Sequence, residues 1–159
     1  MRAVLDCNIW DLLAQDAEAR DRVAAMAGSA ELTIVIPATL RHELEASPFG
    51  GVPDWFAVDV ISDGVAIVGH SRVGECRLGE AVVYSTHLGE SRQVADAVIV
   101  DTAHAYADLF VSQDRRARKR YSEIADGPRS LDYRAFKVEV LGLRPGVEGS
   151  PFDRLRSKP

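Results

Sequence analysis

Cysteine is scarce in this chain, and neither cysteine nor histidine forms a pattern typical of a metal site. The 159 residues include only Cys7 and Cys76, with no CxxC pair and no Cys–His spacing of the kind that binds zinc. The four histidines are scattered along the sequence. We therefore expect neither a disulfide framework nor a zinc site, and we expect Cys7 to be a half-buried free thiol.

Long hydrophobic runs are also missing. No apolar stretch approaches the roughly 18 to 20 residues that span a bilayer, and the apolar stretch before Asp6 is too short for a secretory signal. We expect a cytoplasmic protein with no membrane partner. Hydrophobic residues make up 47% and charged residues 27%, which is an ordinary globular balance. We expect one domain over residues 1–143, followed by a loosely ordered tail over residues 144–159.

Hydrophobic patterning alternates between strands and helices. Continuous apolar runs predict strands at 2–5, 32–36, 109–112 and 138–141, and shorter or alternating runs predict strands at 56–61 and 65–68. Helical periodicity or composition predicts helices at 8–14, 17–27, 37–46, 75–88 and 94–107. This order indicates an α/β fold with a mostly parallel central sheet flanked by helices.

Four acidic residues fall at strand ends or helix starts: Asp6, Glu43, Asp96 and Asp114. Ligands of parallel sheets bind at the carboxyl ends of the strands, so these four carboxylates could converge there. Oxygen ligands without His or Cys select Mg²⁺ or Mn²⁺, which can activate water for attack on a phosphodiester. The alternative is structural: Asp114 could be the N-cap of the helix that follows it, and Glu43 could lie on the surface.

Four short motifs in this order resemble those of the PIN-domain family. They are a strand ending in Asp6 with Asn8 two positions on, a Glu43-Leu44 pair on a helix, an Ala95-Asp96 pair opening a helix, and Ser112-Gln113-Asp114 after a strand. The resemblance covers the chain from about residue 2 to 141. By size, the chain is most similar to the VapC-like toxins of bacterial toxin–antitoxin pairs.

The resemblance implies a three-layer α/β sandwich and a Mg²⁺-dependent endoribonuclease. It further implies a homodimer that a cognate antitoxin holds inactive, with Asp6, Glu43, Asp96 and Asp114 as the catalytic metal ligands. The chain departs from the family pattern at Cys7, where Thr or Ser is commoner, and at Arg116, where many relatives carry another acid. Residues 52–91 match no motif.

Three further polar residues lie close to these motifs. Asn8 either orients Asp6 or caps the following helix, and Ser112 either orients Asp114, contacts a phosphate or is a plain strand-end hydroxyl. Asp101 lies five residues beyond Asp96 on one predicted helix, which separates the two by about 140°. We therefore favour Asp96 as the ligand.

The net charge of −5 does not favour indiscriminate binding of nucleic acid, but five of the six residues from 115 to 120 are Arg or Lys. A basic helix beside an acidic metal site could hold the flanking phosphates of RNA, with Arg115 and either Arg118 or Lys119 on one face. The alternative is a solvated face paired with surface acids.

Two other functions are compatible with parts of the pattern. A phosphatase of the haloacid dehalogenase class also begins with a strand ending in Asp, but it needs a second Asp where this chain has Asn8. A PIN fold that has lost catalysis would serve as an interaction module, although all four acids are present here.

Overall fold

Five short strands form one parallel sheet in the computed structural model of the chain, in the order β3-β2-β1-β4-β5. The structure describes residues 1–64, 74, 94–122 and 129–143. The strands are β1 (Arg2–Leu5), β2 (Thr33–Pro37), β3 (Val58–Ile61), β4 (Leu109–Val111) and β5 (Arg129–Leu131). Every pairing among these described strands is parallel, which confirms the predicted α/β class.

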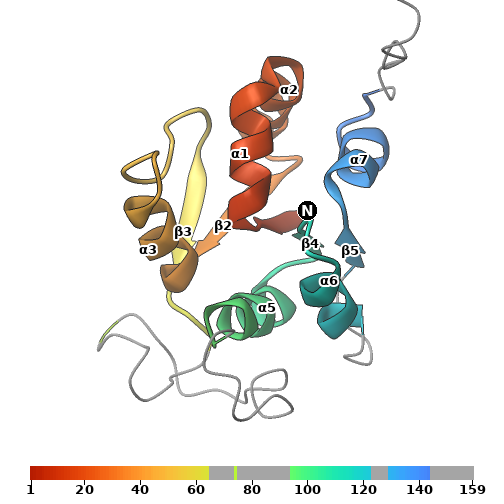
Figure 1. Cartoon of the computed structure of the whole chain (residues 1–159). Helices are drawn as coiled ribbons and strands as arrows, with labels where there is room; N and C mark the ends of the chain where they lie inside the picture. The colour runs from red at the N-terminus through yellow and green to blue at the C-terminus, as the bar shows by residue number, and fades with distance from the viewer. Residues whose placement is uncertain (65–73, 75–93, 123–128, 144–159) are drawn as a thin grey trace, which may run out of the picture.

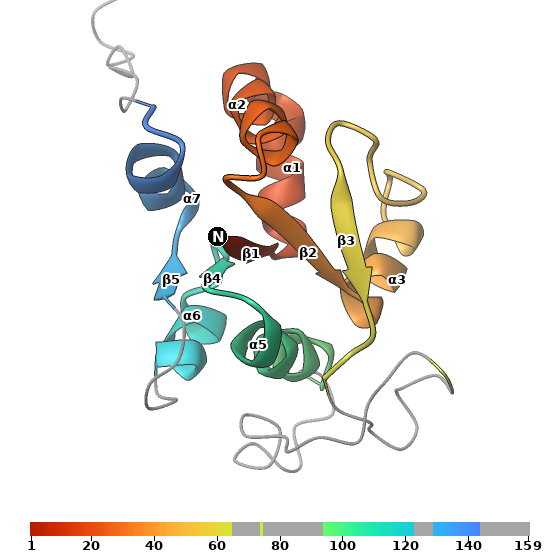
Figure 2. The same ribbon diagram turned by 180° about the vertical axis from the view of Figure 1, so that it is seen from behind.

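Helices cover both faces of this sheet. They are α1 (Cys7–Gln15), α2 (Ala17–Gly28), α3 (Ala38–Ala46), α5 (Val94–Tyr106), α6 (Arg115–Ser122), α7 (Tyr133–Ala135) and the π-helix η2 (Phe136–Val140). Figures 1 and 2 show α5 and α6 side by side on one face of the sheet, with α1 and α2 on the opposite face. The chain therefore folds as three layers.

The central strands are apolar because they are covered on both faces. Val4 and Leu5 of β1 and Ile34 and Ile36 of β2 are completely buried, as expected of a parallel sheet between two helical layers. The strands predicted at 2–5, 32–36, 56–61 and 109–112 are all confirmed within a residue or two at their ends.

The predicted strand at 138–141 is wrong, because this segment is helical. Asp132 caps the helix start by accepting a hydrogen bond from the Ala135 backbone N–H at 2.8 Å. The Leu141 N–H donates to the Phe136 carbonyl at 3.1 Å, and both side chains are buried while Val138 is exposed. The β-branched run was misleading because a five-residue spacing, not alternation, brings the apolar residues to the core. The sheet edge is occupied instead by β5, which the sequence pattern did not predict.

Two further predicted elements, the strand at 65–68 and the helix at 75–88, lie outside the described residues, as does the tail at 144–159. The helices predicted at 8–14, 17–27, 37–46 and 94–107 correspond to α1, α2, α3 and α5. Among the helices that the structure describes, none has the length and apolar character needed to cross a membrane.

Candidate active site

The sheet has a topological switch point between β1 and β4. From β1 the chain continues to β2 on one side, while β4 lies against β1 on the other side. Leu5 pairs with Val111 in this ladder, and the Asp6 N–H donates to the Val111 carbonyl at 2.9 Å. The residues that follow both strands therefore leave the sheet at the same level. In parallel α/β sheets a crevice at such a switch point is where ligands bind.

Asp6 directly follows β1 at this switch point, and three hydrogen-bond donors fix its carboxylate. It is the N-cap of α1, and its Oδ1 accepts a hydrogen bond from the Cys7 N–H at 2.8 Å. Its Oδ2 accepts from Asn8 Nδ2 at 2.8 Å and from the Ser112 hydroxyl at 2.5 Å. Three hydrogen bonds leave the side chain little rotational freedom, so its orientation is set before any ligand arrives.

Asn8 and Ser112 connect the end of β1 to the segment after β4. The Ser112 hydroxyl, which is completely buried, also accepts a hydrogen bond from the Asp114 N–H at 3.0 Å. Asn8 Oδ1 accepts from the Gln113 N–H at 2.9 Å. Of the alternatives left open by the sequence, Asn8 orients Asp6 and does not cap α1, and Ser112 orients both Asp6 and the backbone of Asp114.

Glu43 reaches the same region from α3 and is bound by Cys7. The Cys7 thiol donates to Glu43 Oε2 at 3.1 Å. The pKa of Glu43 is raised, first by burial and then by the negative charges of Asp6 and Asp96, while the thiol hydrogen bond acts in the opposite direction. Glu43 is therefore not a plain surface residue: it lies half-buried within electrostatic reach of two other acids.

Asp96 lies in the first turn of α5 and is also half-buried. Its pKa is raised, first by burial and then by the charges of Asp6 and Asp114, and the nearby guanidinium of Arg120 partly offsets this effect. Asp101 is not among the charges that act on Glu43 or Asp96. It is buried farther along α5, on a different side of the helix from Asp96.

Asp114 has a structural role whatever its chemistry. Its Oδ1 accepts a hydrogen bond from the Arg116 N–H at 2.7 Å, and its carbonyl accepts from the Arg118 N–H at 3.1 Å. These contacts make it the cap of α6, as one interpretation of the sequence had it. A role for Asp114 as a metal ligand stays a prediction.

The four predicted acids thus form a connected electrostatic set. Asp6 acts on both Glu43 and Asp96, Asp96 acts on Glu43, and Asp114 acts on Asp96. Within the described ranges, no three Asp, Glu, His or Cys side chains form a ready-made group of metal ligands.

The basic side chains of helix α6 point in different directions. Arg118 Nη1 donates to the Ser112 carbonyl at 2.5 Å, whereas Arg115 and Lys119 are exposed. Arg120, which was not among the residues predicted to bind RNA, is the basic residue whose charge acts on Asp96. The contact of Cys7 with Glu43 was also not predicted, because the residue types found at this position in the PIN-domain family do not reveal it.

Comparisons with known proteins identify no relative: no family model matches the chain, and neither a curated protein nor a solved structure is significantly similar to it. Function must then be inferred from the site itself, because a fold of this class hosts many unrelated activities.

Proposed function

We propose that this chain is a metal-dependent endoribonuclease in which Asp6, Glu43, Asp96 and Asp114 hold Mg²⁺ or Mn²⁺. One observation carries the proposal. The Asp6 carboxylate is fixed by Asn8 and Ser112 at the switch point of the sheet, and its charge acts on the half-buried carboxyls of both Glu43 and Asp96.

The donor set fits a hard divalent cation. Carboxylates are the ligands that Mg²⁺ and Mn²⁺ prefer, and half-buried acids whose pKa is raised by burial and by neighbouring carboxylates, as for Glu43 and Asp96, gain most from a positive charge placed beside them. When bound, such an ion would activate water and stabilise the negative charge that develops on the phosphodiester during the reaction. Because the charges of Glu43 and Asp96 both interact with that of Asp6, Asp6 is the ligand that would be shared.

The residues around the acids would position and hold them. Ser112 and Asn8 keep Asp6 in one orientation, and Cys7 restrains Glu43 through its thiol hydrogen bond. Asn8 occupies the position at which a haloacid dehalogenase-like phosphatase needs an acid, and its amide is already committed to Asp6 and to the Gln113 N–H. That arrangement favours the nuclease over the phosphatase.

The PIN-like motifs extend the proposal to biological context. The similarity of these motifs to VapC-like toxins suggests a cognate antitoxin and a homodimer as the partners of this chain. Purification of the chain with the product of a neighbouring small reading frame, followed by mass measurement of the complex, would test both expectations.

The activity is tested by incubating the chain with single-stranded RNA and Mn²⁺. We expect cleavage that EDTA abolishes and that Asp6→Asn or Asp96→Asn lowers at least about 100-fold, since each removes a negative ligand. Glu45→Gln is the matched control, because Glu45 lies on the same helix as Glu43 but is exposed and pairs with Arg41. Full activity of Asp6→Asn, or no cleavage by the parent, would rule the proposal out.

A further inference from the structure

The basic residues of α6 are not equivalent, because two buried side chains fix the rotation of the helix. Ala117 and Tyr121 are buried and define the face that packs on the core. At about 100° per residue, Arg116 and Arg120 fall on one flank of that face and Arg118 on the other. Lys119 points almost directly away from the core.

The flank that carries Arg118 is directed towards the residue that follows β4. The Arg118 guanidinium is bonded to the Ser112 carbonyl, on the backbone that runs beside β5. This contact stabilises the junction between β4 and α6, and it occupies a guanidinium that would otherwise be available to bind substrate. Arg118 is therefore a structural residue of the helix.

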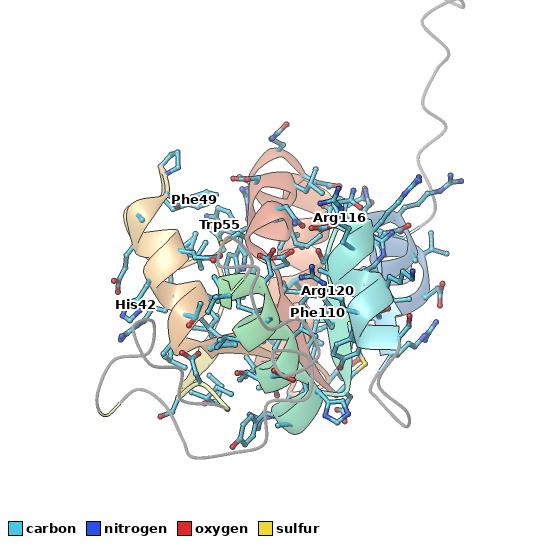
Figure 3. All side chains as sticks on the ribbon, turned by 60° about the horizontal axis from the view of Figure 1, so that its bottom comes forward. His42, Phe49, Trp55, Phe110, Arg116 and Arg120 are labelled. Atoms are coloured by element: carbon cyan, nitrogen blue, oxygen red, sulfur yellow. The ribbon has the colours of Figure 1, made fainter. Side chains whose placement is uncertain are left out.

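The opposite flank is directed towards the acids. The Arg120 charge acts on Asp96 across the contact between α6 and α5. Figure 3 shows Arg120 on the side of α6 towards α5 and Arg116 nearer the start of α6. Residues four apart on a helix are neighbours on its surface, so Arg116 lies one turn before Arg120 on the same flank.

We propose that Arg116 and Arg120 bind the backbone phosphates of RNA as it enters the carboxylate site, in place of the set Arg115, Arg118 and Lys119 expected from the sequence. The inference deepens the proposed function and rests on it for the identity of the substrate. Guanidinium groups suit this task because their planar fork donates two hydrogen bonds to one phosphate.

The chain offers a control of equal charge. Arg116→Gln with Arg120→Gln removes two positive charges from the flank that faces the acids, and Arg115→Gln with Lys119→Gln removes two from the exposed side of the same helix. Any effect of net charge alone would be the same in both double variants. A difference between them must therefore come from position.

The experiment measures binding of a fluorescent single-stranded RNA of mixed sequence by anisotropy, in EDTA and at several salt concentrations. We expect the Arg116/Arg120 double variant to bind at least about tenfold more weakly and to lower the slope of log K against log salt by about 1.4, or about 0.7 for each lost phosphate contact on a single strand. The Arg115/Lys119 variant should stay within about threefold of the parent. Equal losses in both variants, a larger loss in the control, or no RNA binding by the parent would overturn the inference.

Two arrangements of the assay keep the outcomes separate. Arg120→Gln could lower stability because Asp96 loses a neighbouring cation. In that case the single variants Arg116→Gln and Arg115→Gln are compared instead, because neither changes a residue beside Asp96. Cleavage of the same RNA in Mn²⁺ is scored independently. A parent that binds through Arg116 and Arg120 but never cleaves supports this inference and refutes the nuclease. If the parent cleaves RNA but the two double variants bind RNA equally well, the nuclease is supported and the role of Arg116 and Arg120 is refuted.

Discussion

At the scale of single residues, Glu43 and Asp96 carry the electrostatic cost of the site. Both are half-buried, and burial, followed by neighbouring carboxylates, raises the pKa of each. A carboxyl whose pKa is higher in the folded than in the unfolded chain destabilises the fold once it ionises, because the unfolded chain loses its proton more readily. Ionisation of Glu43 and Asp96 at neutral pH therefore lowers the stability of the metal-free fold.

Removing one of these charges should stabilise the metal-free protein. Asp96→Asn is expected to raise Tm by a few degrees at pH 7, since 1 kcal/mol corresponds to about 2–4 °C in a domain of this size. The gain should shrink towards pH 4, because the penalty appears only as the pH rises from the ordinary value of 3.8 through the raised value. Thermal scans at several pH values in EDTA measure this. Asp54→Asn, at an exposed position, is the control, and a gain in Asp96→Asn that does not depend on pH would contradict the explanation.

The Cys7 thiol should react slowly with alkylating agents in the folded chain. Burial, together with the Glu43 carboxylate that accepts its hydrogen bond, raises the pKa of Cys7 well above its usual range. Because the thiolate is the reactive form, native Cys7 should be alkylated by iodoacetamide at pH 8 at least tenfold more slowly than in urea. Peptide mapping by mass spectrometry follows Cys7 separately from Cys76. Similar rates in the native and unfolded chain would mean that the thiol does not hold Glu43.

At the scale of elements, α6 joins the sheet to the site. Asp114 caps the start of this helix, and the Arg118 guanidinium donates to the carbonyl of Ser112. The hydroxyl of the same serine orients Asp6. The rotation and position of α6 are thus connected to the acidic cluster through one serine. A shift of this helix would move both the Asp114 carboxylate and the flank that carries Arg120.

Loss of the Arg118 contact should cost stability. We expect Arg118→Ala to lower the free energy of unfolding by about 1.5–3 kcal/mol, the range for a hydrogen bond made by a charged group. Lys119→Ala, which alters an exposed neighbour, should change it by less than about 0.5 kcal/mol. Urea denaturation compares the two variants, and equal values for them would show that the Arg118 bond contributes nothing to the placement of α6.

The elements differ in how far the sequence alone could predict them. The buried strands β1, β2 and β4 have continuous apolar runs, so they and the acids at their ends could be located from pattern. The strand β5 has only three residues and one buried side chain, which is too little for a periodic signal. The π-helix η2 was mistaken for a strand because its β-branched residues outweighed the Asp132 cap.

The same division applies to the candidate site. Asp6 and Asp114 could be placed because Asp6 directly follows one buried strand and Asp114 lies three residues beyond the end of another. The contact of Cys7 with Glu43 depends on how α1 packs against α3, and the direction of Arg120 depends on the rotation of α6. Neither of these is encoded by local pattern. They follow from the packing of segments that are distant in the sequence.

At the scale of the whole molecule, the helical segment after β5 is anchored to the N-terminal helices. Asp16, between α1 and α2, accepts hydrogen bonds from Lys137 Nζ at 2.5 Å and from the Tyr133 hydroxyl at 3.1 Å. Arg22 Nε donates to the Leu141 carbonyl at 3.1 Å. These contacts join the two ends of the described fold on the side of α1 and α2.

This anchor predicts a dependence of stability on pH. Burial tends to raise the pKa of Asp16, but hydrogen bonds from Lys137, the Ala19 N–H and Tyr133 outweigh it, so the net pKa is lowered from 3.8. A lowered pKa adds stability above the unfolded value, and this contribution is lost as the pH falls through the folded value. Lys137→Met should thus cost about 1–2 kcal/mol at pH 7 and progressively less below pH 4. Urea denaturation at pH 7 and pH 3 checks this; an equal loss at both pH values would assign the effect of Lys137 to packing alone.

Direct titration of the chain with Mn²⁺, followed by the electron paramagnetic resonance signal of the free ion, tests most directly whether the four acids form one metal site. We expect the parent and Glu45→Gln to remove Mn²⁺ from solution equally, whereas Asp6→Asn should bind it at least tenfold more weakly, because the Asp6 charge acts on both Glu43 and Asp96. Equal binding by the parent and Asp6→Asn, or no binding by the parent, would show that the four acids do not form one metal site.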